Sequence, residues 1–457
     1  MLDQSIFKAY DIRGIVDQSL TDETVVWIGQ ALGSLAKDEN QKDICVGYDG
    51  RLSSPNICKL LIEGITSTGV NALDIGLVTT PMLYFSTYYL NTKTGVMITG
   101  SHNPPNYNGF KMMVNENTLS AEDIQQLKQR ILNKHFYVGQ GTYSKKNILA
   151  DYKHKILSTV KLRRKMKVAI DCGNGAAGVI AKNLFQELGV DTHMLYDTVD
   201  GNFPNHHPDP SKPDNLAELI EVVKHTDCEL GLAFDGDADR LGVINKDGEI
   251  IFPDRQLMLF AKHVLKNNPQ RKIIYDVKST RHLNPWIKTY GGDPLIWKTG
   301  HSLIKKKMKQ ENAILAGEMS GHTFFNDRWY GFDDGVYAGA RLLEILSHEE
   351  LPIQEVFNNI PKSFSTPEIN ISVAEGEQHQ IINTLQNTAV FPDSIEISTI
   401  DGLRVEYADG FGLIRASNTT PVLVLRFEAE TLMALEKIQD DFRNILEKNI
   451  NLKNLPF

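Results

Sequence analysis

Short apolar runs of strand length alternate with amphipathic segments of helix length over most of the chain. Three of these runs share one pattern, in which an apolar strand ends in aspartate and is followed by small or polar residues and then a helix. The runs begin at Asp43, Lys167 and Lys272, roughly 105–125 residues apart. Repeated strand–helix pairs are typical of a mostly parallel sheet covered by helices. The pattern predicts three related α/β units, although three ordinary strand–helix pairs would look similar.

The helices of this part are predicted from apolar positions that recur every three to four residues. They are expected at about 21–37, 54–68 and 178–188. The last hundred residues differ, because strands predominate there. Strands are expected at 369–373, 395–400, 412–415 and 422–427. A terminal helix follows, with an apolar face formed by Leu432, Leu435, Ile438, Phe442 and Ile445. This part is predicted to be a separate α+β unit.

Composition and charge narrow the classes of function. The chain has 457 residues, of which 41% are hydrophobic and 23% are charged, and a formal net charge of −9 at pH 7. The negative charge argues against broad binding to nucleic acid or anionic membranes. The N-terminus lacks the apolar stretch of a signal peptide, and no apolar run is long enough to span a bilayer. Four cysteines without a CxxC pair favour a reducing cytoplasm and no structural metal–thiolate site.

The segment 95–114 is the first candidate for chemistry. It begins as a short apolar strand and stops at the Gly-Ser-His-Asn-Pro-Pro loop that contains Ser101 and His102. The two prolines hold this loop extended, so the serine hydroxyl is mounted on a stiff support. Asn108-Gly109 is predicted to be a tight turn, after which a strand brings Lys111 back towards the serine. A β-hairpin with a polar loop and a surface lysine is an equally good interpretation of this stretch by itself.

Three aspartates at alternate positions follow an apolar strand, and they are Asp235, Asp237 and Asp239. Their charges repel one another, and a divalent cation relieves that repulsion. Oxygen ligands suit Mg²⁺. An EF-hand is a poor match, because its sixth loop position is Arg240 in place of glycine and its twelfth is Lys246 in place of glutamate. A solvated acidic turn is the alternative, but the flanking apolar strands and Arg240 favour a metal site.

A glycine-rich run, Gly173–Gly178, follows another strand and matches GxGxxG, with Asp191 and Asp197 near the expected acidic position. Taken literally, it predicts an NAD-dependent oxidoreductase. The strand ends in Asp171, however, and its carboxylate would lie where a pyrophosphate binds. The favoured interpretation is structural, with glycines for a tight turn and close helix packing.

Further polar segments could bind an anionic sugar. Arg13 in an extended segment can present its guanidinium to an anion, although a surface arginine is more common. Lys278 and Lys298 lie on loops rich in hydroxyls, and Gly317–His322 places Glu and Ser between glycines, where they can bond to sugar hydroxyls. The loop Arg415–Pro421 combines an arginine, an amide and several hydroxyls as anion-binding donors. An ordinary polar loop is the alternative for each.

Four of these motifs, in this order, resemble those of the α-D-phosphohexomutase family. They are Thr99–Pro104, Asp235–Arg240, Gly317–His322 and Arg415–Thr420, and they extend over nearly the whole chain. The resemblance is greatest to the bacterial phosphomannomutase/phosphoglucomutase branch, because Met319 and the Ser-Asn-Thr-Thr sequence differ from the corresponding positions of glucosamine-type relatives. Those relatives carry Glu-Gln-Ser-Gly-His and Arg-Pro-Ser-Gly-Thr.

The resemblance implies an α/β protein with three related α/β domains that have mixed sheets, plus a C-terminal α+β domain, arranged around a central cleft. Each domain would contribute one loop. The expected domains are 1–147 with the phosphoserine loop, 148–250 with the metal-binding loop, 251–362 with the sugar-binding loop and 363–457 with the phosphate-binding loop.

The resemblance also implies a role for each motif residue. Ser101 is the expected phosphoserine, and the expected Mg²⁺ ligands are Asp235, Asp237 and Asp239 together with the phosphate on Ser101. The other expected catalytic residues are His102, Lys111, Arg240, Arg13 and His301. The expected substrate-binding residues are Tyr10, Lys278, His301, Glu318, Ser320, His322, Arg415, Ser417, Asn418 and Thr419. By themselves His301 and His322 would more often be structural.

The implied activity is an isomerase reaction that moves a phosphoryl group between C1 and C6 of a hexose phosphate. The phosphoserine gives up its phosphate, and a hexose 1,6-bisphosphate forms, turns over and returns the other phosphate. Such transfer depends on positioning and charge neutralisation. The base is expected to be Lys111 or His301, and the sequence does not choose between them. A loop that contacts O3 and O4 should accept both mannose and glucose, which differ at C2.

Several alternatives stay open. A phosphoglucosamine mutase-like specificity is one. An aspartyl-phosphate phosphatase with Asp235 as nucleophile is another, but it leaves the serine loop unexplained. A non-catalytic sensor of sugar phosphates is a third. The resemblance favours a cytoplasmic monomer whose partners are small hexose phosphates, with no nucleic acid and no membrane.

Overall fold

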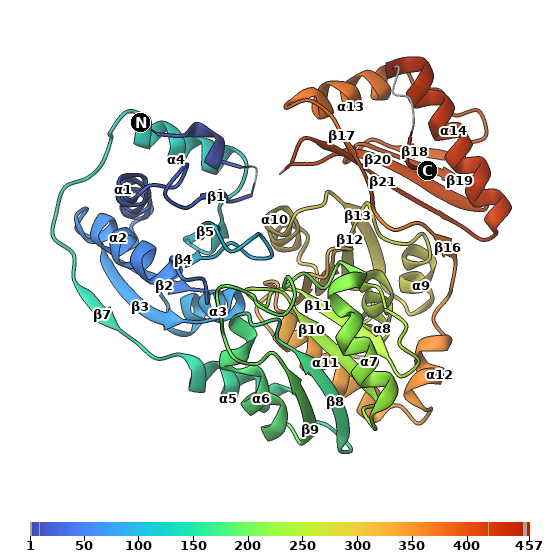
Figure 1. Ribbon diagram of the computed structural model, residues 1–457, viewed down its shortest axis with the longest axis horizontal. Helices are drawn as coiled ribbons and strands as arrows, with labels where there is room; N and C mark the ends of the chain where they lie inside the picture. The colour runs from blue at the N-terminus through green and yellow to red at the C-terminus, as the bar shows by residue number, and fades with distance from the viewer. Residues whose placement is uncertain (1, 9, 419, 451–454) are drawn as a thin grey trace.

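Four β-sheets follow one another along the chain, each accompanied by helices (Figure 1). The computed structural model describes residues 2–8, 10–418, 420–450 and 455–457. The first three sheets contain both parallel and antiparallel pairs, whereas the pairs of the fourth are antiparallel. The predicted α/β class with a different C-terminal unit is confirmed. No helix in the described part of the chain has the length and apolar character needed to cross a bilayer.

The first unit is built on a seven-stranded sheet in the order β1-β5-β4-β2-β3-β7, with β6 paired to β5. Its strands are β1 (Ile12–Ile15), β2 (Asp43–Tyr48), β3 (Asn71–Leu77), β4 (Gly95–Ile98), β5 (Tyr107–Val114), β6 (Asn117–Thr118) and β7 (Tyr143–Lys145). Its helices are η1 (Gln4–Ile6), α1 (Asp22–Asp38), α2 (Ser54–Thr66), α3 (Thr80–Tyr89) and α4 (Glu122–Leu132). Strands β2 and β4 are parallel neighbours. The loops that follow them, including the one with Ser101, therefore lie side by side.

The predicted turn at Asn108-Gly109 is wrong. Both residues lie inside β5, where they pair with Gly14 and Arg13 of β1. A Cβ at Gly109 would lie 2.1 Å from the carbonyl oxygen of Ile12. Glycine is needed here because two strands approach closely, and the chain reverses earlier, between β4 and β5.

The second and third units each contain a four-stranded sheet, in the orders β11-β10-β8-β9 and β13-β12-β14-β15. The strands are β8 (Met166–Asp171), β9 (Val190–Leu195), β10 (Leu230–Phe234), β11 (Leu241–Asn245), β12 (Lys272–Asp276), β13 (Asp293–Trp297), β14 (Leu315–Gly317) and β15 (Thr323–Phe325). The helices of the second unit are α5 (Leu149–Thr159), η2 (Ala176–Val179), α6 (Ala181–Glu187), η3 (Pro213–Leu216) and α7 (Ala217–His225). Those of the third are α8 (Pro253–Asn267), α9 (Leu283–Thr289), α10 (His301–Glu311), α11 (Gly335–His348) and α12 (Ile353–Asn358).

One apolar cluster joins the first three units, although the first unit also has a core of its own that includes Val96, Ile98 and Phe110. Tyr84 and Phe85 of α3 belong to the same buried cluster as Ile170 of β8 and Phe325 of β15. Helix α11 joins the units, because it is buried over nearly its whole length and contacts β10 and β11 of one sheet and β15 of the next. A common core of this kind holds the loops of three units in fixed relative positions.

The fourth unit has a six-stranded sheet in the order β16-β21-β20-β19-β18, with β17 paired to β21, and an apolar core of its own. Its strands are β16 (Phe364–Ser365), β17 (Ile369–Ser372), β18 (Glu396–Ser398), β19 (Leu403–Tyr407), β20 (Gly410–Ala416) and β21 (Val422–Ala429). Its helices are α13 (Glu377–Thr388) and α14 (Leu432–Ile450), which lie together on one side of the sheet (Figure 1).

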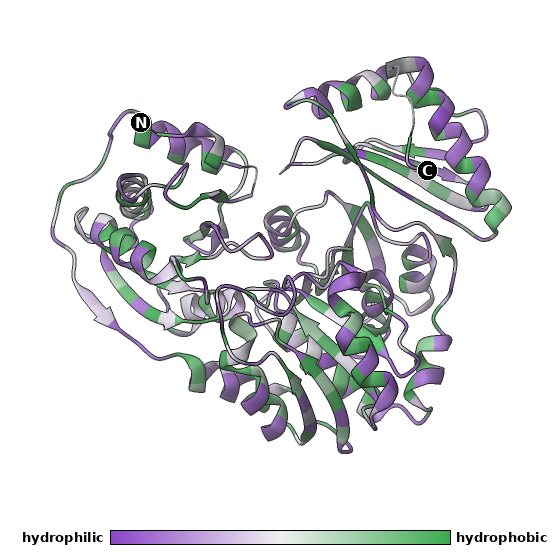
Figure 2. Ribbon diagram, viewed as in Figure 1, coloured by the Kyte–Doolittle hydropathy of each residue, from purple (hydrophilic) through white to green (hydrophobic). Residues whose placement is uncertain are grey.

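Helix α14 follows the predicted apolar pattern in part. Ile438 and Phe442 are buried in the core of the fourth unit, but Leu432, at the first position of the helix, is 58% exposed. Figure 2 shows hydrophilic residues along much of α14, whereas hydrophobic residues prevail in central strands such as β10. The helix therefore covers its sheet with one face only.

Candidate active site

The loop between β4 and β5 holds Ser101 in a buried position. The residue has a φ of 49°, in the left-handed region that residues other than glycine rarely adopt. Its backbone N–H donates to Thr99 Oγ1 at 2.8 Å, and its hydroxyl donates to Asp235 Oδ2 at 3.2 Å. Ser101 Oγ also lies 3.2 Å from His102 Nδ1. Burial, and then nearby cationic side chains, lower the pKa of His102 well below its usual range, so this imidazole is neutral.

The loop after β10 gathers three carboxylates into one cluster. Asp235, Asp237 and Asp239 are fully buried, and one oxygen from each lies within 4.8 Å of the others. The hydroxyl of Thr80, at the start of α3, donates to Asp237 Oδ2 at 2.5 Å. Burial, followed by repulsion from the two neighbouring carboxylates, raises the pKa of Asp235 well above its usual range. Three buried carboxylates this close together are unfavourable unless positive charge lies next to them.

The donor set fits a divalent cation with oxygen ligands. The carboxylates and the hydroxyl of Ser101 are the hard donors that Mg²⁺ prefers. Within the described part of the chain, Asp237 Oδ1 is buried without a hydrogen-bond partner, and an unsatisfied buried acceptor costs on the order of 1–3 kcal/mol. Lys111 offsets part of the negative charge, because its ammonium donates to Asp237 Oδ2 at 2.6 Å and also to Asp239.

Three cationic side chains surround the cluster. Burial lowers the pKa of Lys111, but the attraction of the carboxylates outweighs it, and the pKa is raised overall. Arg240 donates its backbone N–H to Asp235 Oδ1 at 3.1 Å, and its Nε lies 3.7 Å from Asp235 Oδ2. Arg13 Nη1 donates to Asn103 Oδ1, on the serine loop, at 2.8 Å. Positive charge is thus arranged around the place where Ser101 meets the carboxylates.

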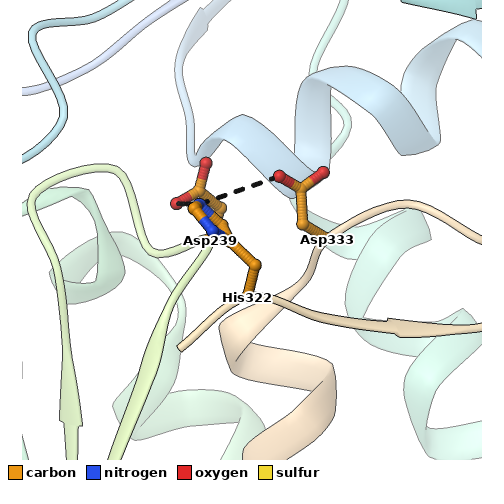
Figure 3. Close-up of side chains that lie close together, drawn as sticks. All are labelled: Asp239, His322 and Asp333. Carbon is orange, nitrogen blue, oxygen red and sulfur yellow. Dashed lines mark ion pairs between the residues drawn. The ribbon is translucent and has the colours of Figure 1, made fainter. Parts of the chain in front are cut away.

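His322 joins the acidic loop to the loop between β14 and β15. Its Nε2 lies 3.2 Å from Asp239 Oδ1, and its Nδ1 lies 3.2 Å from Glu318 Oε2 and 2.9 Å from Ser320 Oγ. Burial lowers its pKa, but Asp239 and Glu318 raise it to about 9. A protonated imidazole therefore connects the two loops at neutral pH. Figure 3 shows it beside the carboxylates of Asp239 and Asp333.

His301 lies next to this pair in a different charge state. Its ring stacks on that of His322, with centroids 5.5 Å apart, and its Nδ1 lies 3.3 Å from Asp333 Oδ2. Lys305 donates to the other oxygen of Asp333 at 2.8 Å. Burial, and then the charge of Lys305, lower the pKa of His301. One histidine is therefore kept neutral and its neighbour charged.

The loop between β20 and β21 connects three units. Arg415 Nε donates to Asp401 Oδ2 at 3.0 Å, and the same oxygen accepts from the backbone N–H of Thr299 at 3.0 Å. The hydroxyl of Tyr10 donates to the carbonyl of Thr299 at 2.9 Å and accepts from Asn418 Nδ2. Residues of the first, third and fourth units therefore meet at one point.

Of the other residues expected to bind the phosphate, Ser417 and Lys278 lie at or beside this loop. Ser417 Oγ is 3.0 Å from Thr420 Oγ1. Thr419 lies outside the described residues. Lys278, in the third unit, donates to Glu368 Oε2 at 2.9 Å, at the entry to the fourth unit. An ammonium, a guanidinium and polar donors therefore lie on both sides of the junction between these units.

Several polar residues of the site were not found from the sequence. They are Arg51, Thr80, Lys305, Asp333, Glu368 and Asp401. Asp401 lies just before β19, and Arg51 lies three residues after the end of β2 at Tyr48. Asp49, directly after β2, is a weak hint for Arg51, but no local pattern identifies the distant partners of either residue.

The glycine run after β8 is used for close packing. A Cβ at Gly175 would lie 2.8 Å from the carbonyl oxygen of Gly236, and one at Gly178 would lie 2.3 Å from that of Asp197. Residues with side chains would push these segments apart. This supports the structural interpretation of the run over dinucleotide binding.

Comparisons with known proteins cover the whole chain. Four models of the family described as phosphoglucomutase/phosphomannomutase match, namely alpha/beta/alpha domain I at residues 4–138, domain II at 148–248, domain III at 252–364 and the C-terminal domain at 368–445. A phosphoglucomutase of Neisseria meningitidis is 56% identical over 453 residues, which is 98% of each chain. A phosphomannomutase/phosphoglucomutase of Pseudomonas aeruginosa is 53% identical over 456 residues, 100% of this chain and 98% of the relative.

A solved structure agrees with these relatives. The crystal structure of a phosphoglucomutase/phosphomannomutase family protein from Burkholderia thailandensis has a TM-score of 0.96 and 49% identity, and the match covers 100% of both chains. The fold and these relatives define the class of protein, an α/β enzyme of the phosphoryl-transferring mutases. The chain belongs to the phosphoglucomutase/phosphomannomutase family, and it is a phosphohexomutase, an isomerase. This membership sets aside the oxidoreductase, phosphatase and sensor interpretations.

Proposed function

We propose that this enzyme interconverts the 1- and 6-phosphates of mannose and of glucose through a phosphoserine at Ser101 and a hexose 1,6-bisphosphate. The observation that carries the proposal is the 3.2 Å contact between Ser101 Oγ and Asp235 Oδ2 inside the buried cluster. A phosphoryl group on that oxygen would lie against carboxylates and would require positive charge around it. The names of the relatives, phosphoglucomutase and phosphomannomutase/phosphoglucomutase, support both sugars.

The three carboxylates, Asp235, Asp237 and Asp239, together with the phosphate on Ser101, would hold Mg²⁺. When bound, the ion supplies charge neutralisation for the moving phosphoryl group. Lys111 and Arg240 add positive charge at the same place, which lowers the energy of a transition state rich in negative charge. Arg13 holds the serine loop through Asn103, and His102 lies against the serine hydroxyl.

A proton must leave the sugar hydroxyl that attacks the phosphoserine, and Lys111 and His301 are the two candidates to accept it. The directions of their pKa shifts favour His301. The carboxylates keep Lys111 protonated, so it acts as a cation. Burial and Lys305 keep His301 neutral, and its Nδ1 faces the carboxylate of Asp333, which orients the ring.

The substrate would be held from two sides. Glu318 and Ser320 would bind the O3 and O4 hydroxyls of the sugar, with His322 bonded to both side chains. The non-reacting phosphate would be gripped by Arg415, Ser417, Asn418 and Thr419, with Tyr10 and Lys278 beside them. The contact of Tyr10 with Asn418 supports this, because it brings the first unit to the phosphate loop. Mannose and glucose share the configuration at O3 and O4, so both sugars should fit.

The test of the phosphoserine uses the dephosphorylated enzyme, Mg²⁺ and glucose 1,6-bisphosphate, followed by digestion and mass mapping of the phosphate. We expect the phosphate on Ser101. The variant Ser101→Ala should lose turnover by roughly 1,000-fold or more, while its affinity for glucose 1-phosphate stays within about threefold. Ser158→Ala, on α5 and away from the site, is the matched control. Phosphate on Asp235 in place of Ser101 would contradict the proposal.

Sugar specificity is tested by coupled assays with mannose 1-phosphate, glucose 1-phosphate and glucosamine 1-phosphate under matched conditions. We expect turnover of the first two. Turnover of mannose 1-phosphate alone would overturn dual specificity, and a preference for the amino sugar would favour the phosphoglucosamine alternative.

We further propose domains 1–147, 148–250, 251–362 and 363–457, a monomer and a cytoplasmic location, with hexose 1,6-bisphosphate as the activator. Strands β7 and β11 and helix α12 end at Lys145, Asn245 and Asn358. The short connections that follow these elements support the boundaries. The location is supported by four buried cysteines, Cys45, Cys58, Cys172 and Cys228, none of which forms a disulfide.

A further inference from the structure

A buried arginine lies directly beneath the serine loop. Arg51 follows β2, and only 1% of its surface is exposed. Its guanidinium donates to four backbone carbonyls of the neighbouring loop, namely Ser101 at 2.8 Å, Asn103 at 2.6 Å, Pro104 at 2.5 Å and Tyr107 at 2.9 Å. The remaining N–H, on Nε, donates to Asp49 Oδ2 at 3.2 Å. Every N–H of the guanidinium is therefore used, and most of them hold the loop that carries Ser101.

Asp49 holds the beginning of the same loop. Its Oδ2 accepts from the hydroxyl of Thr99 at 2.8 Å and from the backbone N–H of Gly100 at 3.3 Å. Its Oδ1 accepts from the backbone N–H of Arg51 and from the hydroxyl of Ser54. The carboxylate and the guanidinium thus form one rigid support, which contacts the loop on both sides of Ser101.

The second unit closes this support from outside. The ring of Phe203 lies 5.3 Å from the guanidinium carbon of Arg51. A Cβ at Gly201 would lie 2.8 Å from Arg51 Cα, and a Cβ at Gly100 would lie 2.4 Å from Arg51 Cζ. The guanidinium is therefore enclosed between the serine loop and the second unit, with no room for another position.

We propose that Arg51 is a positioning residue for phosphoryl transfer, which holds Ser101 in its left-handed conformation with Oγ directed at Asp235. The proposal rests on the proposed role of Ser101. A residue with positive φ persists only where its surroundings enforce it, and the bonds from Arg51 to the carbonyls of Ser101 and Asn103 supply that constraint. A displacement of about 1 Å at a reacting atom can cost on the order of 100-fold in rate. Among the described residues, the side-chain hydrogen bonds of Arg51 go to Asp49 and to the segment that carries Ser101, so it acts mainly through Ser101, while its charge also attracts Asp237.

The test compares Arg51→Lys with Arg341→Lys. Arg341 is also fully buried, but it bonds to Asp327 and Tyr337 in the shared core. Lysine keeps the charge and loses the fork of donors in both variants. We expect the kcat of Arg51→Lys, per folded molecule, to fall roughly 30-fold or more, with KM for glucose 1-phosphate within about threefold. Arg341→Lys should lower Tm yet keep kcat within about twofold.

A second readout follows the loop itself. Hydrogen exchange over residues 99–107 should accelerate in Arg51→Lys and not in Arg341→Lys. If Arg51→Lys does not fold, Asp49→Asn is read in the same way, because it keeps the shape of the support and removes its charge. The proposal would be overturned if kcat per folded molecule were unchanged in Arg51→Lys, or in Asp49→Asn where that variant replaces it.

The rate at which Ser101 takes phosphate from glucose 1,6-bisphosphate separates this inference from the proposed function. Wild-type enzyme that takes no phosphate at Ser101 would overturn the proposed function. Wild-type and Arg51→Lys enzymes that take it equally fast would overturn only the positioning role. A rate that falls together with kcat would support it.

Discussion

The two ends of the site are held in different ways. Ser101 and the acidic cluster come from units that share one apolar core, and the side chains that hold them are buried. The phosphate loop with Arg415 belongs to the fourth unit, which has a separate core. That unit reaches the third through polar contacts, such as Arg404 to the carbonyls of Val277 and Ser279 at 2.6 and 2.7 Å. A small apolar cluster of Val277, Phe411 and Leu413 accompanies them.

This difference separates the residues proposed for phosphoryl transfer from the residues proposed to bind the second phosphate. The side chains proposed to transfer phosphate lie on units that one buried apolar cluster joins, which holds their loops in fixed relative positions. The side chains proposed to hold the second phosphate lie on a separately packed unit, and interfaces between units that are not large and hydrophobic commonly permit relative motion.

Among the changes that test this comparison, the largest effect should come from breaking the acidic cluster. Asp237→Asn removes one of three carboxylates, so we expect kcat to fall roughly 100-fold or more and half-maximal activity to require more Mg²⁺. Steady-state assays over a Mg²⁺ titration, and after removal of metal with EDTA, measure this. Asp247→Asn, on an exposed turn, is the control. Full activity of Asp237→Asn at the same Mg²⁺ would mean that the cluster is not a metal site.

A smaller effect, on KM and not on kcat, should follow from a change in the loop proposed to bind the second phosphate. Arg415→Ala removes a buried guanidinium from the phosphate loop, so we expect KM for glucose 1-phosphate to rise roughly 10- to 100-fold with kcat changed by a few-fold at most. Lys437→Ala, at an exposed position on α14 of the same unit, is the matched control. If kcat fell and KM did not change, the fourth unit would take part in chemistry, and the comparison above would fail.

The smallest effect concerns the stability of the shared core. Burial raises the pKa of Asp334, which caps α11, to about 7, although hydrogen bonds from Tyr337, Tyr152 and Trp329 oppose the shift. The ordinary value is about 4. Between these values the folded state holds the proton more tightly than the unfolded state, so the contribution of Asp334 to stability falls as pH rises from about 4 to 7 and levels off above.

Asp334→Asn should remove this slope, which is at most about 1.4 kcal/mol per pH unit. Urea unfolding at pH 5, 6, 7 and 8 measures the free energy of unfolding of both proteins. Asp393→Asn, at an exposed position in the fourth unit, should leave the slope unchanged. Parallel pH profiles for wild type and Asp334→Asn would contradict the shifted pKa.

Local patterns in the sequence were sufficient for the class of fold and for the strands that precede the motif loops. The apolar runs before Asp171, Asp235 and Asp276 became β8, β10 and β12, because a buried strand needs little more than consecutive apolar residues between turns. The same locality made the four motifs visible, since each lies on a single loop. Asn108-Gly109 shows the limit, because pairing with β1, more than ninety residues away, overrode a local preference for a turn.

The sequence by itself therefore determined the class of fold and the motifs whose residues are proposed to carry the chemistry. Only the tertiary structure decided how those residues act. Arg51 meets the serine loop across about fifty residues, and Asp333 meets His301 from another element, so no pattern along the chain reveals either contact. The charge states of Lys111, His301 and His322 also belong to the folded protein, because burial and neighbouring charges, which exist only after folding, set their pKa values.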